Sequence, residues 1–296
     1  MVLSRRSIVI LLLCSIIFSQ EDAPNTVLHE ILTTDNVEYL GEITSENDST
    51  LTLKAPSGIT VTIPLSSIVS RTVFEGDVKE GKVWRPDPNK SMYLFAPSAF
   101  PIESGNSYCR DFCLFFPSYN FGVGDVISAQ VGAFWFPGMP LENTPLIASG
   151  KYSFINFKKI KMAAGIMYLS FPGFDEGERF GTGFTFVTGT LGDRFSHLSG
   201  SLGWGFVQTE GNWKFMERPI LVVAGNRRTT NTTALVAEIW LPPELDLEMV
   251  PIMASVRFFG KKISVDIGGL WTTNMEGLLP MPLINFTYQT NHQKLK

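Results

Sequence analysis

Apolar and polar residues alternate within the stretch GDVISAQVGAFWFPG, residues 124–138. From Ile127 to Trp135 every second residue is apolar, and serine, glutamine and glycine lie at positions 128, 130 and 132. A period of two predicts a β-strand with one apolar and one polar face. The function then depends on which face meets water, because a soluble sandwich buries its apolar face and a membrane barrel turns it toward lipid.

The same alternation recurs beyond residue 90, for example in KISVDIGGLW and in MPLINFTYQ. Strands that cross a bilayer at a tilt are about 9–11 residues long. Twelve segments of roughly that length are candidates for such strands. They are residues 91–100, 107–117, 125–136, 145–155, 159–171, 180–190, 195–208, 217–227, 233–242, 250–259, 262–272 and 281–289.

The connections between these segments alternate in length. Those after odd segments are long, such as PGMPLENT and TTNMEGLLP, and those after even segments are mostly short, such as LGDR and the KK pair at 261–262. Outer-membrane barrels join long extracellular loops and short periplasmic turns in this way, and a soluble sandwich has no reason to do so. Aromatic residues at both ends of most segments are typical of two interfacial belts. The pattern therefore predicts that the apolar face points outward.

With these features the chain resembles the bacterial outer-membrane β-barrel class, porin-like in architecture, over residues 90–289. The closing segment, with Phe286 and Tyr288, is similar to the aromatic-rich final strand of that class. The resemblance implies an all-β fold with an antiparallel transmembrane β-barrel of about twelve strands. It also implies a place in the bacterial outer membrane, with outer-membrane lipid and the barrel-assembly machinery as partners.

The N-terminus has the pattern of a secretory signal. Arg5 and Arg6 precede an apolar run, residues 8–18, that is too short to cross a bilayer as a helix. We predict a signal peptide over residues 1–19. Leu13 stands where a small residue precedes a lipidated cysteine, so we expect no lipidation at Cys14.

Residues 20–80 are predicted to form a small β-module in the periplasm. Residues 21–80 contain eleven acidic and three basic residues, a net charge of −8. Turn signals separate five short predicted strands, and Gly41 suits a strongly curved second strand, so the module resembles an SH3-like or Sm-like small barrel. The strands are residues 27–33, 37–45, 50–55, 59–63 and 67–71. The remaining divisions are a linker at 81–90, the barrel at 91–289 and a C-terminal tail at 290–296.

The charge of this module bears on its partners. A nucleic-acid binder needs a basic surface to meet phosphates, and an exported module with a net charge of −8 offers the opposite. We therefore predict no nucleic-acid partner and expect a periplasmic protein instead.

Charged residues on the polar face of the predicted strands should line the lumen. By alternation they are Lys151, Lys161, His197, Glu238, Arg257 and Asp266. Two interpretations stay open. The residues form the polar lining of a narrow passive channel, or they form an internal ion-pair network that fills a structural barrel.

The long connections are acidic and would surround the outer mouth. The candidates are Glu142, Asp175, Glu176, Glu178, Glu244, Asp246 and Glu248. A ring of acids raises the local cation concentration within a Debye length, so an open barrel would show a modest cation preference.

Catalytic motifs are not visible. The chain has three histidines and no G-x-S-x-G or H-E-x-x-H motif, so we predict no catalytic, cofactor-binding or metal-binding residues, no cofactor and no enzymatic activity. Cys109 and Cys113 lie four residues apart in one predicted strand, too far for a disulfide. Two alternatives remain beside the membrane barrel: a secreted, soluble β-rich binding protein, and a barrel enzyme acting on lipids or peptides.

Overall fold

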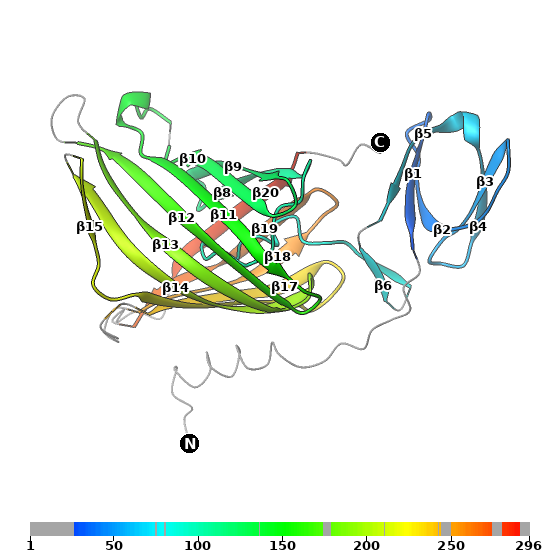
Figure 1. Ribbon diagram of the computed structural model, residues 1–296. Helices are drawn as coiled ribbons and strands as arrows, with labels where there is room; N and C mark the ends of the chain where they lie inside the picture. The colour runs from blue at the N-terminus through cyan, green and yellow to red at the C-terminus, as the bar shows by residue number, and fades with distance from the viewer. Residues whose placement is uncertain are drawn as a thin grey trace, which may run out of the picture. The chain divides into compact units, whose positions relative to one another are not determined.

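The computed structural model describes residues 27–74, 76–79, 81–135, 137–173, 179–209, 211–241, 243, 250–273 and 280–290. Within these residues the regular structure is β-strand, apart from two single-turn 3-10 helices (Figure 1). The chain divides after Pro86 into two compact units. No helix in the described part of the chain is long and apolar enough to cross a membrane. The predicted signal peptide, residues 1–19, lies outside the described residues.

The N-terminal unit contains a five-stranded antiparallel sheet with the order β4-β3-β2-β1-β5. A 3-10 turn, η1 Leu65–Ser67, joins β4 to β5. The five strands start and end within two residues of their predicted bounds. They are β1 His29–Thr33, β2 Glu38–Glu46, β3 Thr50–Lys54, β4 Thr60–Pro64 and β5 Ile68–Val73. The assignment of this sheet to the SH3-like or Sm-like type stays a prediction.

The core of this unit comes from the apolar side of the alternation. Ile31, Leu51, Leu53 and Ile63 pack together, and each is at most 3% exposed. A Cβ atom at Gly41 would overlap the Leu53 side chain and a backbone carbonyl, so β2 needs a glycine there to approach β3.

A short hairpin follows the sheet. β6 Asp77–Lys79 pairs with β7 Lys82–Trp84. β7 lies inside the range predicted to be a linker, because the prolines that break the pattern come only after Trp84, at positions 86 and 88.

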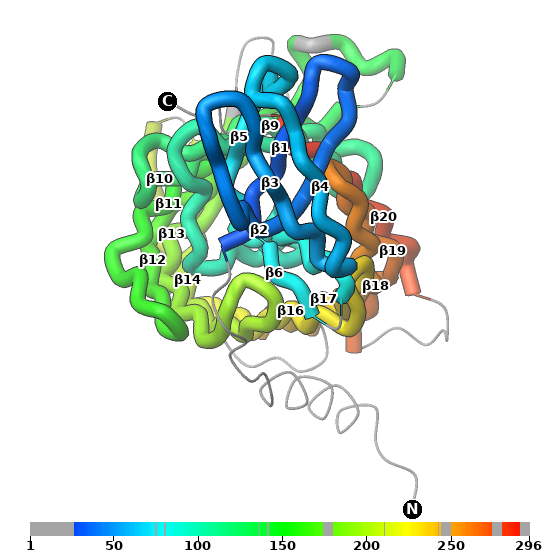
Figure 2. The backbone as a smooth tube through the Cα atoms, turned by 90° about the vertical axis from the view of Figure 1, so that its right-hand side faces the viewer, coloured from blue at the N-terminus to red at the C-terminus, as the bar shows by residue number. Residues whose placement is uncertain are grey.

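The second unit is a closed antiparallel barrel of twelve strands, as predicted. Each strand pairs with the next along the barrel, and β20 pairs with β8 to close it. Figure 2 shows β10–β14 along one side of the barrel and β18–β20 along the other. The strands are β8 Ser107–Phe112, β9 Phe116–Val123, β10 Ile127–Ala133, β11 Leu146–Asn156, β12 Ile160–Pro172, β13 Arg179–Gly192, β14 Ser196–Thr209, β16 Ile220–Arg228, β17 Thr233–Leu241, β18 Pro251–Phe259, β19 Ile263–Thr272 and β20 Met281–Gln289. β15 Asn212–Phe215 pairs with the last residues of β14, beyond the part of β14 that pairs with β16.

The two ends of the barrel differ in their connections. At one end, the short-turn end, five turns of three or four residues join the strands: residues 124–126, 157–159, 193–195, 229–232 and 260–262. From β10 onward the connections at the other end, the long-connection end, are longer, as the sequence predicts. β8 begins and β20 ends at the short-turn end.

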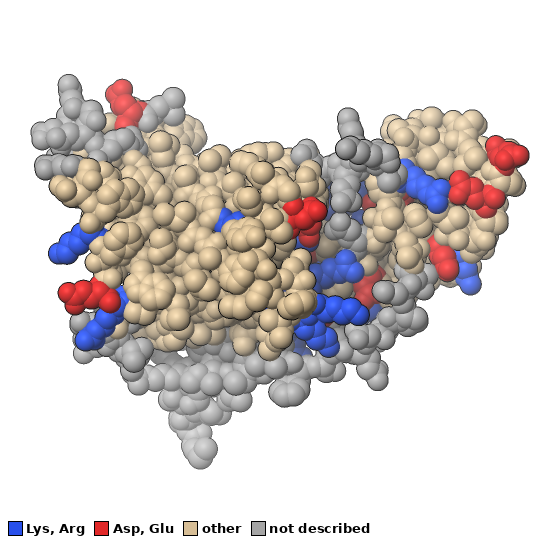
Figure 3. Space-filling model, viewed as in Figure 1, with Lys and Arg blue, Asp and Glu red and all other residues tan. Residues whose placement is uncertain are grey.

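Side chains alternate between the lumen and the outer surface. On β14, Ser199 and Ser201 point into the lumen and are 2% and 5% exposed, whereas Leu202 and Trp204 point outward and are 44% and 38% exposed. Other exposed outward residues are also large and apolar, among them Val131, Leu146, Ile166, Val187, Leu235 and Ile267. In Figure 3, charged side chains of the barrel gather toward its two ends and are nearly absent between them. The apolar face of the alternating pattern therefore points outward.

Aromatic rings cluster on the outer surface near the long-connection end. The ring of Trp213 on β15 lies 5.2 Å from that of Phe206 and 6.1 Å from that of Tyr168, between centroids. Trp213 and Phe215 are both 53% exposed. Amphipathic rings at the end of an apolar surface are typical of the boundary between hydrocarbon and water.

Two predicted strands are wrong. Residues 91–100 form no strand, because their apolar residues are consecutive rather than alternating and Pro97 lacks a backbone donor. Residues 107–117 form two strands rather than one. Cys113 and Leu114, at φ 55° and 66°, make the turn between β8 and β9, and this turn lacks the glycine or asparagine that usually marks one.

The outward apolar face predicts how the barrel responds to a charge. Leu202→Arg places a cation on the middle of β14, and we expect the free energy of unfolding in lipid vesicles to fall by about 2–4 kcal/mol. Denaturant titration followed by tryptophan fluorescence measures the change. Thr230→Arg, in an exposed turn, is the matched control and should leave the stability nearly unchanged. Equal stability of both variants would show that water, not lipid, covers β14.

Candidate functional site: the filled lumen

Residues 87–106, here called the plug segment, come after the hairpin β6–β7 and before the first barrel strand in the chain, and most of their side chains are buried in the lumen. The segment folds back on itself: the Tyr93 N–H donates to the Ala96 carbonyl at 2.9 Å, and the Ser98 N–H donates to the Ser91 carbonyl at 3.0 Å. Residues 93–96 thus form the tip of a hairpin-like loop. Its most buried side chains, at most 8% exposed, are Asp87, Asn89, Ser91, Met92, Tyr93, Leu94, Ala96, Ser98, Ala99, Phe100 and Ile102.

One wall carboxylate holds the tip of the plug segment. Glu238 on β17 is 0% exposed, and its Oε2 accepts hydrogen bonds from the backbone N–H groups of Leu94, Phe95 and Ala96 at 3.0–3.1 Å. Its other oxygen accepts from the Trp240 indole at 3.0 Å. A carboxylate that accepts several N–H bonds in a dry site makes strong, charge-assisted contacts. Alternation predicts that Glu238 faces the lumen, and the structure shows the backbone it binds there.

A buried arginine joins the plug segment to two strands. Arg257 on β18 is 1% exposed and contacts Asp87 of the plug segment at 2.6 Å and Asp266 of β19 at 2.6 and 3.1 Å. It also donates to the Tyr93 carbonyl at 2.9 Å. Asn285 of β20 donates to Asp266 at 3.1 Å. Removing one member of such a buried network leaves a charge without compensation, which is strongly destabilising.

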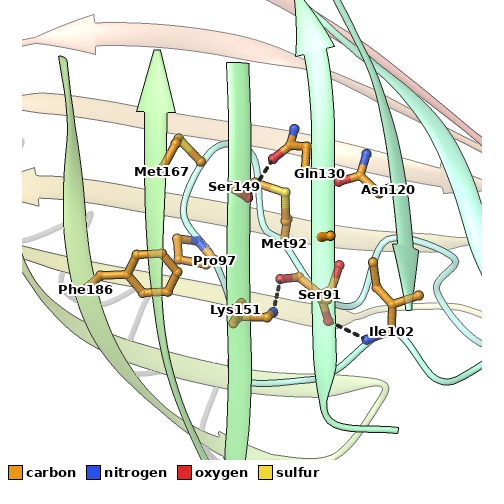
Figure 4. A pocket seen from close by; sticks show the side chains of 12 residues that line it. Ser91, Met92, Pro97, Ile102, Asn120, Gln130, Ser149, Lys151, Met167 and Phe186 are labelled. Atoms are coloured by element: carbon orange, nitrogen blue, oxygen red, sulfur yellow. Dashed lines mark hydrogen bonds between the residues drawn. The ribbon is translucent and has the colours of Figure 1, made fainter. Parts of the chain in front are cut away.

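A lysine on the opposite wall binds the plug backbone. The Lys151 ammonium on β11 donates to the carbonyl oxygens of Ser91, Ser98 and Phe100 at 3.0, 2.6 and 2.8 Å. An ammonium has three donors, and these contacts use all of them. Figure 4 shows Lys151 reaching Ser91 from β11, with Met92, Pro97 and Ile102 of the plug segment close by.

Arg110 on β8 is a lumen residue that the sequence reasoning missed. It is 3% exposed and donates to the Leu94 carbonyl and, at 3.5 Å, to the Met92 sulfur. The alternation of Tyr108, Arg110 and Phe112 carried the signal, because these residues share one face of the strand. Asp87 was missed for another reason, since it lay in the predicted linker.

Wall hydroxyl groups satisfy further backbone groups of the plug segment. The Ala99 N–H donates to Thr190 at 2.7 Å, and the Ile102 N–H donates to Ser128 at 2.9 Å. The Ser153 hydroxyl donates to the Ala99 carbonyl at 3.0 Å. The plug segment is therefore held around the barrel, by β10, β11 and β13 as well as by the strands named above.

The two remaining predicted lumen residues also meet the plug segment. His197 is 3% exposed, and its ring lies 5.2 Å from that of Tyr93 and 4.9 Å from that of Phe100, between centroids. Its Nδ1–H donates to the Asp193 carbonyl at 3.0 Å. The Lys161 ammonium lies 4.6 Å from the centre of the Phe100 ring. The structure thus brings all six predicted lumen residues together around one segment.

The six charged groups that form these hydrogen bonds and ion pairs balance, and Lys161 and Arg228, 8% and 5% exposed, are two further buried cations near the short-turn end. Three cations, Arg110, Lys151 and Arg257, and three anions, Asp87, Glu238 and Asp266, are each at most 7% exposed. Asp87 belongs to the plug segment, and the other five residues belong to the wall. Among these six groups the wall contributes one excess positive charge, which Asp87 compensates.

Little space remains beside the plug segment. The two cavities described there have volumes of about 30 and 10 Å³. A water molecule needs roughly 10–15 Å³ of this kind of volume. The larger cavity is lined by Ser91, Met92, Pro97, Ile102, Asn120, Ser128, Ala129, Gln130, Ser149, Lys151, Met167 and Phe186 (Figure 4). These cavities admit water and exclude larger solutes.

The predicted acidic mouth is only partly within the described residues. Glu142 lies on the exposed 3-10 turn η2 Leu141–Asn143 of the connection between β10 and β11. The other candidates, Asp175, Glu176, Glu178, Glu244, Asp246 and Glu248, lie outside the described residues. Among the described residues, no three histidine, cysteine, aspartate or glutamate side chains gather to hold a metal ion.

The closed antiparallel barrel, apolar outside and polar inside, defines a β-barrel of the outer-membrane type. No protein-family model and no curated protein sequence matches the chain. Among solved structures, the chain is similar to the in-vitro folded, trimeric form of OmpT, an outer membrane protein of Vibrio cholerae. The two share 13% identity over 90% of this chain and 97% of that chain, with a TM-score of 0.35.

A loop L8 deletion mutant of the same OmpT shares 11% identity over 90% of this chain and 97% of that chain, with a TM-score of 0.34. OmpF of Salmonella typhi in complex with daunomycin shares 12% identity over 89% of this chain and 95% of that chain, with a TM-score of 0.32. The fold class follows from the strand pairing and alternation of the chain itself.

The prediction that the chain has no enzymatic activity is wrong, because it rests on missing motifs alone. One barrel fold carries many unrelated functions. Missing sequence motifs therefore do not exclude catalysis in this fold.

The contacts of Glu238 predict how the tip of the plug segment is held. In Glu238→Ala, the backbone amides of residues 94–96 lose their acceptor, at a cost of about 3–5 kcal/mol for a broken buried charge network. We expect their hydrogen exchange to accelerate at least a hundredfold, measured by mass spectrometry on the protein in lipid or detergent. Glu142→Ala, on an exposed turn, is the control. Unchanged exchange in Glu238→Ala would mean that other contacts fix the tip.

Proposed function

We propose that the chain is an outer-membrane β-barrel that is closed at rest by its own plug segment. The proposal rests first on the outer surface. Side chains such as Leu202, Ile267 and Val131 are 44%, 54% and 51% exposed on a wall nearly free of charge. Apolar surface of this extent is costly in water and stable in lipid.

The proposed orientation places the short-turn end in the periplasm. Outer-membrane barrels have short periplasmic turns and longer extracellular loops. The plug segment precedes β8, and β8 begins at the short-turn end, so the chain before the plug segment would lie on the periplasmic side. In this orientation the barrel anchors the N-terminal module at the inner surface of the outer membrane.

A single observation favours a closed barrel over a passive channel. The side chains expected to line a pore bind the plug segment instead, most clearly Glu238 through three backbone N–H groups and Lys151 through three carbonyl oxygens. Of the two interpretations that the sequence leaves open, this arrangement supports the internal network that fills the barrel. The two cavities described beside the segment, of about 30 and 10 Å³, are each too small for a solute much larger than water.

The proposed partners follow from this arrangement. Outer-membrane lipid covers the wall, and the barrel-assembly machinery inserts it. The acidic module, with a net charge of −8 over residues 21–80, suits a periplasmic protein with a basic surface rather than a nucleic acid.

Conductance tests the closed state. We expect no steady conductance from the purified full chain in a planar lipid bilayer. Replacing residues 87–103 by a glycine–serine segment of equal length removes the side chains that pack and pair in the lumen and leaves only a flexible backbone, so this variant should conduct in discrete steps. Replacing the exposed turn 229–232 by glycine and serine is the control and should stay closed. Steady conductance from the unmodified chain would contradict the proposal.

Fractionation separates the membrane barrel from the alternative of a secreted soluble protein. We expect the protein in the outer-membrane fraction, released only by detergent. Recovery in the soluble periplasmic or secreted fraction without detergent would overturn the membrane assignment.

A further inference from the structure

Oxygen atoms of the plug segment contact three basic groups of the wall. Arg110 on β8 donates to the Leu94 carbonyl. Lys151 on β11 donates to three plug carbonyl oxygens. Arg257 on β18 donates to the Asp87 carboxylate at 2.6 Å and to the Tyr93 carbonyl at 2.9 Å. Three separate parts of the wall thus present cationic donors toward the same interior volume.

These donors are built into the wall, not scattered on a surface. Arg110, Lys151 and Arg257 are 3%, 7% and 1% exposed, and each projects from a barrel strand into the lumen. The acceptors of Lys151 are all backbone carbonyl oxygens of the plug segment. Once the plug segment moves away, the Lys151 ammonium loses all three of these acceptors, and water or an anion must replace them.

Removal of the plug segment also makes the net charge of the lumen more positive. At the level of these contacts the wall holds Arg110, Lys151 and Arg257 against Glu238 and Asp266. The plug segment supplies the compensating Asp87, which binds Arg257. A lumen without the plug segment therefore has a net positive charge at its buried level. Lys161 and Arg228, which are 8% and 5% exposed, add to that charge near the short-turn end.

We propose that the lumen of this barrel is a binding and passage site for small anions that carry carboxylate or phosphate oxygens, and that the plug segment occupies this site with its own oxygen atoms at rest. The proposal rests on the proposed function, in which the plug segment closes the barrel. Arginine and lysine donors matched to oxygen acceptors are the groups that recognise such anions.

This inference reverses the ion preference expected from the acidic loops alone. Loop acids such as Glu142 are exposed, and salt screens exposed charges beyond about 8 Å at physiological ionic strength. Charges inside a narrow lumen are screened less and lie closer to a passing ion. One uncompensated unit charge about 10 Å from an ion in water changes the local anion-to-cation ratio by roughly fourfold. The lumen charge should therefore decide the preference.

Reversal potentials test the inference directly. The variant with residues 87–103 replaced by glycine and serine is placed in a planar bilayer under a potassium chloride gradient. We expect chloride to permeate at least about twofold better than potassium, given one or more excess unit charges and partial screening. Adding inorganic phosphate should reduce the chloride current. A preference for potassium, or none, would overturn the anion proposal while leaving the closed state intact.

A matched pair of lysines separates lumen charge from charge elsewhere. In the same background, Lys151→Gln should lower the chloride preference toward one. Lys159→Gln, at an exposed turn of the short-turn end, should leave it unchanged. An equal loss in both variants would place the selectivity at the rim rather than in the lumen.

Quenching of tryptophan fluorescence tests the inference without any conductance. Trp240 points into the lumen beside Glu238, and the difference between chains with and without Trp240→Phe isolates its signal. After replacement of residues 87–103, quenching of Trp240 by iodide should increase more than quenching by caesium. If the variant fails to conduct, the closed-barrel proposal fails. The iodide-to-caesium ratio tests the anion proposal separately, because an unchanged ratio would overturn that proposal whether or not the variant conducts.

Discussion

Buried polar groups must be hydrogen-bonded, and the interior of this barrel depends on that requirement. Alternation in twelve strands turns polar and charged side chains inward, and the plug segment brings a loop of backbone with few internal partners. The wall side chains and the plug backbone supply each other's hydrogen-bond partners. Glu238 accepts hydrogen bonds from three backbone N–H groups, and Lys151 donates hydrogen bonds to three backbone carbonyl groups. In an open barrel, water would make these bonds. Here the chain makes them itself, so the wall and the plug segment are parts of one structure.

The attachment of the plug segment is uneven. Toward β16–β20 it meets both the Arg257 network and an apolar cluster in which Tyr93 and Leu94 pack with Val222, Met253 and other wall residues. Toward β9–β12 it meets Lys151, several hydroxyl groups and a smaller apolar cluster in which Met92 packs with Ile147 and Met167, with the cavity of about 30 Å³ between. Burial of apolar area acts on both sides, whereas the paired charge network holds only the first; the second side has Lys151 and several hydroxyl groups instead. The two sides therefore differ in the kind of contact that holds the plug segment.

The sequence predicts this barrel better than it predicts the content of its lumen. A period of two is a local property, so it identifies Lys151, Glu238 and Arg257 as inward residues before any pairing is known. Their partners in the plug segment lie 51 to 170 residues away, and no local pattern encodes such pairings. Residues 91–100 were mistaken for a strand because an apolar stretch buried by a lumen has the same composition as one buried by a sheet. The turn at Cys113 and Leu114 escaped notice because neither residue favours a positive φ.

The plug segment is a hairpin-like loop whose two arms lie side by side, with Lys90 and Glu103 paired at 2.5 Å across them. One arm begins at Asp87, which pairs with Arg257 near the end of β18. The other arm ends at Ser104, whose N–H donates to the Asp125 carboxylate in a turn of the short-turn end. Because entry and exit share one mouth, no chain end has to thread through the barrel for the loop to go in or come out. The barrel can therefore close its last seam, β20 against β8, either before or after the loop is seated. Topology leaves the order of these two assembly steps free.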